Sequence, residues 1–239
     1  MANTEKSYAD RLDRGRSMQA AIAGFTPVFV PTDSNLTAGA FESYLNAVEA
    51  ANGEVSDAEM AMSLAVSARR TGAEGVQDVA LRVQDHVGAN VAWKACQANV
   101  AMAAKLVRGT HVNRKPKAEP PEAPAKKARM GAQSQQGFAD IAKNFGKLIA
   151  AVKKVPGYSA PAGSGLTVAE LEARAAAFGV LNQAVTDAEA ELGEKQRMRG
   201  EYYDGENGLR DKMTAIKKAV RSQYGTSSPE YLAVKGIGL

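Results

Sequence analysis

Side chains able to perform covalent chemistry are few in this chain and are scattered along it. There is one cysteine, Cys96, and there are two histidines, His86 and His111. A nucleophilic thiol needs a neighbouring base, whereas Cys96 lies among apolar residues, which favours a small buried side chain. No Glu-x-x-His pair is present, so the di-metal site of ferritin-like bundles is not expected. We therefore predict no catalytic residue, no metal site and no cofactor.

Anion binding is a second chemistry to consider, because basic side chains and prolines cluster near the middle of the chain. Such clusters release counterions from nucleic acid or lie on anionic lipid. The same composition is also typical of an extended, solvated spacer, and both interpretations stay open. The residues that would contact an anion or a protein partner are Arg114, Lys115, Lys117, Lys126, Lys127 and Arg129.

This segment also carries the basic balance of the chain, whose net charge is +4. Residues 1–111 sum to −2 and residues 131–239 to +2, whereas residues 112–130 sum to +4. The parts on either side of the linker are therefore close to neutral. This balance argues against a broad nucleic-acid-binding face on either of them.

An internal repeat organises the rest of the sequence. Leu36-Thr37 recurs as Leu166-Thr167, an offset of 130 residues, and Asp57-Ala58-Glu59 recurs as Asp187-Ala188-Glu189 at the same offset. Further along, the offset becomes 133, as expected for a short insertion in a turn. Similarity at a fixed period over this length indicates a tandem duplication.

Each copy is expected to form three helices. Prolines prevent a helix between the first and second, Thr37 and Thr167 are suitable N-caps, and Glu170 completes a capping box with Thr167. Glycines in the segments 71–75 and 204–208 are expected to end the long second helix. The expected helices cover 7–24, 38–70 and 76–107 in the first copy, and 136–155, 168–203 and 209–224 in the second.

The long second helices show apolar residues at alternating spacings of four and three, which is typical of a heptad seam. In both copies this seam includes polar residues at the same places, Asn52 and Asn182, and Glu59 and Glu189. A polar residue on an apolar seam lowers stability but can fix the register of two helices. We interpret these four residues as register-fixing positions.

The C-terminal residues resemble those of a known family. The sequence Tyr224-Gly225-x-x-Ser228-Pro229-Glu230-Tyr231-x-x-Val234-x-Gly236-Ile237 follows a helix that starts at Gly208-Leu209. This ending resembles a group of bacterial all-helical proteins of uncharacterised function, mainly over residues 136–239. The resemblance implies a bacterial, all-helical protein and implies no activity, cofactor or site residue.

Alanine-rich composition and the repeat together predict an all-α fold, a tandem duplication of a three-helix up-down bundle with one long central helix per copy. The expected domains are a first helical repeat over 1–111, a basic proline-rich linker over 112–135 and a second helical repeat over 136–239. No apolar run is long enough to span a membrane, and the N-terminus is too polar for a secretory signal. A cytoplasmic location is the resulting expectation.

Two functions from different classes are compatible with these features. The first is a non-enzymatic structural or assembly protein, a homo-oligomer or a partner of other protein subunits, in which non-closing contacts between helical repeats build a filament or lattice. The alternative is a nucleic-acid-associated protein that binds through the basic linker.

Overall fold

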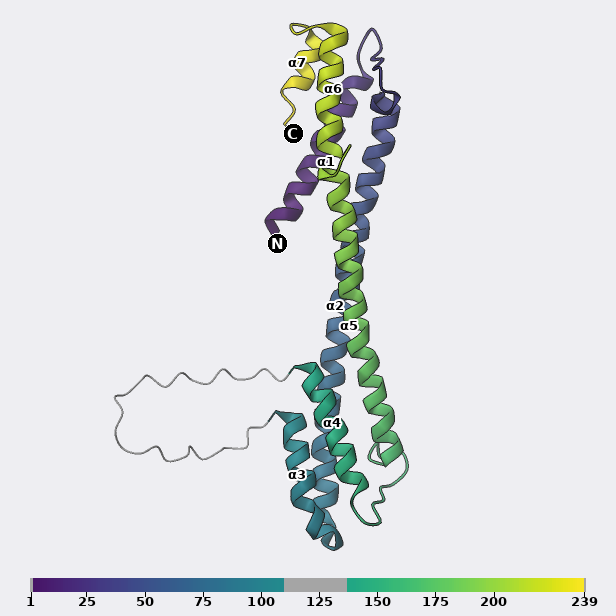
Figure 1. Cartoon of the computed structure of the whole chain (residues 1–239), viewed down its shortest axis with the longest axis vertical. Helices are drawn as coiled ribbons and strands as arrows, with labels where there is room; N and C mark the ends of the chain where they lie inside the picture. The colour runs from purple at the N-terminus through teal and green to yellow at the C-terminus, as the bar shows by residue number, and fades with distance from the viewer. Residues whose placement is uncertain (1, 110–136, 239) are drawn as a thin grey trace, which may run out of the picture. The chain divides into compact units, whose positions relative to one another are not determined.

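The computed structural model describes residues 2–109 and 137–238, and most of these residues are helical with no strand among them (Figure 1). The expectation of an all-α fold is thus confirmed. The elements in chain order are α1 (Ala2–Ala23), η1 (Ser34–Leu36), α2 (Ala38–Ala89), η2 (Val91–Trp93), α3 (Lys94–Arg108), α4 (Phe138–Lys153), α5 (Val168–Asp204), α6 (Leu209–Tyr224) and α7 (Pro229–Lys235).

Two compact units make up the chain, and they do not follow the boundaries expected from the repeat. Unit 1 combines Met1–Met62 with Ala188–Leu239, and unit 2 is the continuous segment Ser63–Asp187. The long helices α2 and α5 each contribute one part to unit 1 and the other part to unit 2. A division of the chain at the linker, into 1–111 and 136–239, therefore separates residues that share a core.

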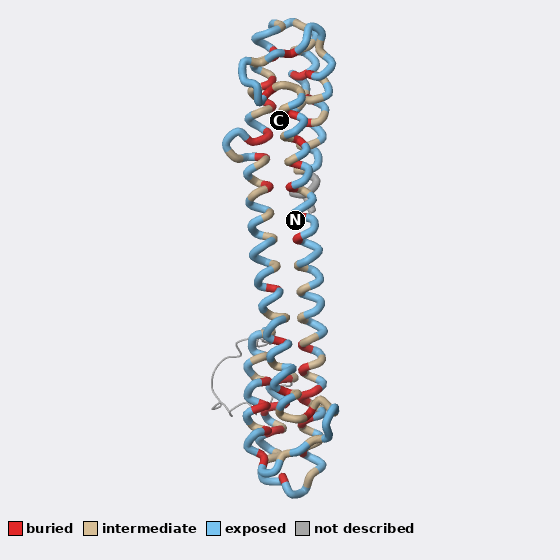
Figure 2. Tube along the Cα trace, turned by 90° about the vertical axis from the view of Figure 1, so that its right-hand side faces the viewer, coloured by how far each residue is buried: buried red, intermediate tan, exposed pale blue. Residues whose placement is uncertain are grey.

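The core of unit 1 is built from helices that are far apart in sequence. Its buried residues come from α1, the connection after it, η1 and the first part of α2, and from the end of α5 together with α6 and α7. Figure 2 shows buried positions in red along the chain. Salt bridges and hydrogen bonds reinforce the contact of α1 with α2, where the Arg16 guanidinium lies 2.7 Å from both Asn46 Oδ1 and Glu49 Oε2. The core residues are Met18, Ile22, Phe29, Leu36, Phe41, Leu45, Val48, Tyr203, Leu209, Met213, Ile216, Val220 and Val234.

The core of unit 2 combines the last part of α2 with α3, α4 and the first part of α5. Helices α3 and α4 pack along each other, and Asn144 Nδ2 donates to the Leu106 carbonyl at 3.3 Å. The largest fully buried side chains of this core are Phe145, Leu148, Leu171 and Phe178. Along α2 and α5, the stretches 59–72 and 186–198 include no buried position.

The predicted start of α5 is confirmed in detail. Thr167 Oγ1 accepts from the Glu170 backbone N–H at 3.3 Å, and Glu170 Oε2 accepts in return from the Thr167 N–H at 3.0 Å. These reciprocal bonds form a capping box, which satisfies backbone donors that the first turn leaves free. Hydrogen bonds from Thr167 lower the pKa of the Glu170 carboxyl, so the acceptor stays ionised. Thr37 caps α2 in the same way, through the Ala40 N–H.

The expected end of a helix is confirmed at the glycine segment 204–208, and it is wrong at the glycine segment 71–75. Asn207, at φ 61°, helps the chain to turn before α6, whereas α2 continues without a break through Gly72 and Gly75. A helical glycine lowers stability by about 1 kcal/mol relative to alanine. Close packing offsets this at Gly72, because a Cβ there would lie 2.5 Å from Leu181 Cδ1.

The helix break in this part of the chain lies instead at Asn90, inside the range expected to form one helix over 76–107. Asn90 Oδ1 accepts from the Ala92 N–H at 3.0 Å and starts the short η2 turn. Gln97 Nε2 donates to the carbonyls of Val87, Gly88 and Asn90, which closes the end of α2 against the start of α3. These two polar side chains supply the caps that a helix break requires.

Candidate functional site

The two seam asparagines lie in different surroundings. In unit 1, Asn52 Nδ2 donates to the Tyr203 hydroxyl at 2.9 Å, and that hydroxyl donates to the Tyr8 carbonyl at 3.0 Å. The side-chain oxygens of both Asn52 and Asn182 are buried and have no hydrogen-bond partner in the described structure. The Asn52 contact crosses from α2 to α5, so it suits the register role expected of this residue.

The seam prediction is wrong at the two glutamates, since Glu59 and Glu189 are both exposed. On α2 the buried residue is Ala58, three positions after Val55 rather than four. The strict alternation of four and three therefore does not continue past Val55 on α2. The exposed position keeps the charge of Glu59 in water, where it is not desolvated.

Around Tyr203, unit 1 contains a polar network that the sequence did not reveal. Arg11 donates to Asp204 Oδ1 at 2.6 Å and to the Tyr203 carbonyl at 3.2 Å, and its guanidinium lies 4.9 Å from the centre of the Tyr203 ring. The guanidinium of Arg199, only 5% exposed, lies 4.3 Å from the centre of the Tyr8 ring. The residues of this network come from both ends of the chain, so no sequence motif could show them together.

Burial and hydrogen bonding shift the acid–base behaviour of this network in a consistent direction. The hydrogen bond from Arg11 lowers the pKa of the Asp204 carboxyl, and burial raises the pKa of the Tyr203 hydroxyl. Asp204 is therefore held ionised and Tyr203 is held neutral, as a hydrogen-bond donor. This arrangement stabilises an ion pair and a buried phenol.

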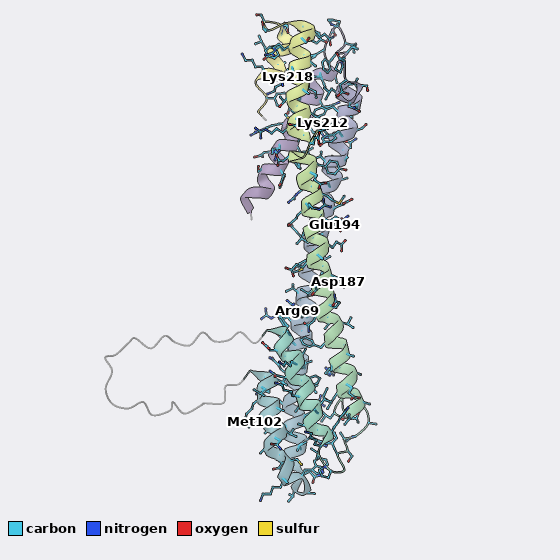
Figure 3. The ribbon with its side chains drawn as sticks, in the orientation of Figure 1. Arg69, Met102, Asp187, Glu194, Lys212 and Lys218 are labelled. Atoms are coloured by element: carbon cyan, nitrogen blue, oxygen red, sulfur yellow. The ribbon has the colours of Figure 1, made fainter. Side chains whose placement is uncertain are left out.

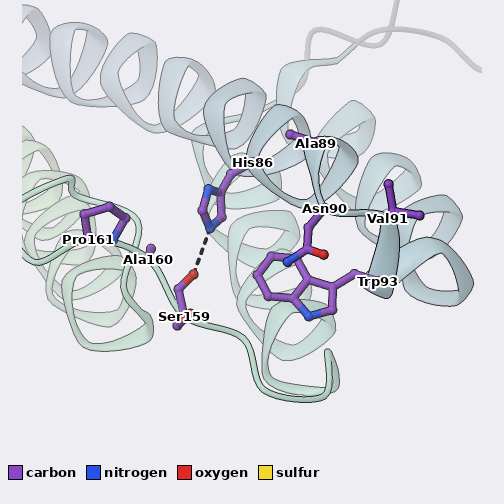
Figure 4. A pocket seen from close by; sticks show the side chains of 8 residues that line it. All are labelled: His86, Ala89, Asn90, Val91, Trp93, Ser159, Ala160 and Pro161. Carbon is purple, nitrogen blue, oxygen red and sulfur yellow. Dashed lines mark hydrogen bonds between the residues drawn. The ribbon is translucent and has the colours of Figure 1, made fainter.

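A surface depression of about 670 Å³ lies in unit 2, at the turn between α2 and α3 (Figure 4). His86 Nε2 donates to the Ser159 carbonyl at 2.9 Å, because a carbonyl can only accept. Trp93 Nε1 donates to the Pro156 carbonyl at 2.9 Å. The residues that line the depression are His86, Ala89, Asn90, Val91, Trp93, Ser159, Ala160 and Pro161.

Three aromatic rings stand together beside this depression. Ring centres of Trp93 and Tyr158 lie 5.5 Å apart, and the His86 ring lies 5.7 Å from each. The Tyr158 hydroxyl donates to the Leu166 carbonyl at 2.8 Å. Each of the three aromatic side chains therefore donates a hydrogen bond to a backbone carbonyl of the 156–166 loop. The histidine acts here as a loop anchor. A scarcity of aromatic residues, 6% of the chain, is the one sequence signal that draws attention to them.

The matching loop of unit 1 is anchored differently. Gln223 Nε2 donates to the Val28 carbonyl and Gln223 Oε1 accepts from the Val30 N–H, both at 2.9 Å. The Tyr224 hydroxyl donates to the Pro27 carbonyl at 2.6 Å. Phe29 points inward and is 4% exposed, whereas Val28 and Val30 are 73% and 72% exposed. The loop is thus firmly attached and presents two valines to solvent.

A second hollow, of about 430 Å³, lies in unit 1 beside Tyr44, Tyr202, Glu201 and Lys212. The Tyr44 hydroxyl donates to the Tyr202 carbonyl at 2.5 Å, and burial raises the pKa of Tyr44 to about 12. Lys212, labelled in Figure 3, places its ammonium 4.8 Å from the centre of the Tyr44 ring. The chain itself therefore supplies the cation that this ring face attracts.

Charge divides unequally between the two structural units. Unit 1 contains 13 basic and 17 acidic side chains, a net charge of −4, and unit 2 contains 17 and 9, a net charge of +8. Half of the charge on unit 2 belongs to residues 110–136. The two units thus differ in net charge by more than the parts on either side of the linker do, which sum to −2 and +2.

Other expected sites can be placed only in part. Arg114, Lys115, Lys117, Lys126, Lys127 and Arg129 lie outside the described residues. Within the described ranges, no group of three or more His, Cys, Asp or Glu side chains could hold a metal ion. No helix in the same ranges is long and apolar enough to cross a membrane. Cys96 is half-buried, in a groove between α3 and α4.

Comparison with known proteins gives no family assignment: no protein-family model, no curated protein and no solved structure matches this chain. Its function must therefore be inferred from the geometry and charge of the chain itself.

Proposed function

We propose that this chain is a non-enzymatic structural protein that assembles with further copies of itself. The observation that carries the proposal is the opposite net charge of the two units, −4 and +8. Opposite charges on two different surfaces of one chain favour a contact between unit 1 of one copy and unit 2 of the next. A contact between unlike surfaces does not close on itself unless the rotation closes a ring, so it builds a filament or lattice.

The way in which polar side chains are used supports a structural role. His86, Trp93 and Tyr158 all direct their polar atoms to backbone carbonyls of one loop. Arg11 and Asp204 neutralise each other. These groups hold the fold together, which is the use of polar side chains expected of an assembly protein.

The finer architecture, a tandem duplication of a three-helix unit, is part of the same proposal. Residues related by the repeat offsets occupy corresponding buried places in the two cores, which supports it. In each unit, the first helix of one copy packs with the third helix of the other copy. The corresponding pairs are Met18 and Leu148, Ile22 and Val152, Leu36 and Leu166, Phe41 and Leu171, Val83 and Ile216, and Val87 and Val220.

Light scattering coupled to size-exclusion chromatography, followed by negative-stain microscopy, tests the function. We expect particles larger than a monomer that grow with protein concentration. We also expect them to shrink as salt is added, since salt screens the attraction between exposed charges. A monomer at every concentration and salt level would refute self-assembly.

Nucleic-acid binding is a second candidate, favoured by the length of the basic segment. Helices α3 and α4 are antiparallel neighbours, which a connection of about 2–8 residues can join, yet residues 110–136 separate them. Neutralising Lys115, Lys117, Lys126, Lys127 and Arg129 should abolish salt-sensitive binding to labelled DNA or RNA. Unchanged binding after these substitutions would exclude this segment as the binding site.

A further inference from the structure

We propose that Val28 and Val30 of one copy seat in the unit 2 depression beside Trp93 of the next copy. This inference rests on the proposed self-assembly and names the two surfaces that meet. The valine pair of unit 1 is called the protrusion, and the hollow lined by His86, Ala89, Val91 and Trp93 is called the depression.

The protrusion is prepared for contact because its backbone is already fixed. Gln223 pairs with both Val28 and Val30, as a neighbouring strand would, and Phe29 anchors the loop from inside. Binding therefore orders little additional chain, which lowers the entropy lost on association. Pro27 and Pro31 lack an N–H group, so the segment is protected from pairing with other strands. Side-chain contact is the interaction that remains for the two exposed valines.

The depression is lined by apolar side chains together with the polar side chains of Asn90 and Ser159, and Trp93 at its base is only 7% exposed. The indole N–H of Trp93 and Nε2 of His86 are both bonded to backbone carbonyls, so an incoming valine leaves neither group unpaired. Val91 is 83% exposed at the edge, and Ala89 and Ala160 add small apolar side chains (Figure 4). Covering this surface removes apolar area from water at both partners.

A second copy of the chain is the occupant that the charges favour. The protrusion belongs to the unit with net charge −4 and the depression to the unit with net charge +8. Long-range attraction between these units brings a protrusion toward a depression and keeps like units apart. Because the two surfaces differ, every copy that joins leaves one protrusion and one depression open for the next.

The two loops arose at equivalent places of the repeat and now differ in a complementary way. At the offset of 130, Val28 corresponds to Tyr158 and Val30 to Ala160. Tyr158 turns inward to pack with Trp93, whereas Val28 remains in solvent. One loop therefore bounds a depression and the other projects from its unit.

Two lysine variants of the full chain test the pairing. Val28→Lys/Val30→Lys disables the protrusion, and Ala89→Lys/Val91→Lys disables the depression; all four side chains are exposed, so folding is preserved. Each variant alone should be monomeric in light scattering. Mixed together they should form one-to-one dimers that do not grow, because only one intact pairing remains. Met102→Lys on α3 (Figure 3) and Leu232→Lys on α7 are matched controls that should assemble like the unmodified chain.

The outcomes separate this inference from the proposed function. Assembly that persists in both double variants would refute the valine contact and leave self-assembly standing. Monomers in each variant with no dimer on mixing would refute the head-to-tail pairing. An unmodified chain that never assembles would refute the proposed function and the inference with it.

Discussion

Asn52 and Tyr203, 151 positions apart in the sequence, share a hydrogen bond of 2.9 Å that ties the first part of α2 to the end of α5. The Tyr203 side chain is fully buried and passes the interaction on to the Tyr8 carbonyl. This phenol is the point where α1, α2 and α5 meet in unit 1. Its hydroxyl therefore links three separate helices.

Removing that hydroxyl should weaken unit 1. Tyr203→Phe keeps the ring and leaves the Asn52 amide donor without its acceptor, an effect of about 1–3 kcal/mol for a buried group. Urea unfolding followed by circular dichroism measures the change. Tyr202→Phe, at the neighbouring half-buried position, is the matched control and should change stability much less. Equal effects of the two substitutions would show that the hydroxyl of Tyr203 makes no special contribution.

The ion pair of Arg11 with Asp204 should appear in the pH dependence of stability. Its hydrogen bond lowers the pKa of Asp204 below the ordinary value of 3.8, so its stabilisation is complete above that pH and disappears as the pH falls through the lowered pKa. Asp204→Asn should lower stability at neutral pH by about 1 kcal/mol or less, since the carboxylate is 56% exposed.

Thermal unfolding of both chains over a range of pH checks this. The difference between the unmodified chain and Asp204→Asn should shrink as the solution becomes more acidic than the ordinary pKa of the carboxyl. Asp57→Asn, an exposed change in α2, is the control and should show no such trend. A difference that stays constant into acid would contradict the assignment.

Two glycines of α2 should respond oppositely to alanine. A methyl group added at Gly53 would meet open space, so Gly53→Ala should raise stability by about 0.5–1 kcal/mol through helix propensity alone. At Gly72 the new Cβ would lie 2.5 Å from Leu181 Cδ1 and force that side chain to move, so Gly72→Ala should lose part or all of the gain. Chemical denaturation of the two variants side by side measures the contrast, and an equal gain at both sites would contradict it.

Cleavage of the connection between α3 and α4 should leave the fold together. Both cores take residues from each side of the connection, so a chain cut by a protease at a site inserted within residues 110–136 should elute as one complex. Size-exclusion chromatography and circular dichroism before and after cleavage are the measurements. Separation of the two fragments under native conditions would show that the shared cores are weaker than this arrangement implies.

Local signals in the sequence predicted helix starts and the all-α class well, because capping and proline effects act over a few residues. Thr167 with Glu170, and the limits of α6, are examples. The prediction of a turn at 71–75 is wrong, because packing against Leu181 outweighs the low helix propensity of Gly72. The heptad prediction is wrong at Glu59, because the buried position on α2 falls one residue earlier, at Ala58.

The candidate site was beyond sequence reasoning for a different reason. Arg11 and Asp204 are 193 positions apart, and His86 and Ser159 are 73 apart. No spacing rule relates residues that meet only when α1 packs with α5 in unit 1, or when the 156–166 loop packs on α2 in unit 2. The size of the charge difference was also not visible: the parts on either side of the linker sum to −2 and +2 along the chain, whereas the two units sum to −4 and +8.

The discontinuity of unit 1 has a consequence for how the chain matures on the ribosome. Unit 2 is one uninterrupted segment, so all its helices are available once residue 187 has emerged. The first 62 residues must wait, with Phe41 and Leu45 uncovered, until residues from 188 onward are synthesised and can meet them. Residues 63–187 are therefore ready to fold before residues 1–62, and residues 1–62 stay longer in need of protection than the segment that follows them.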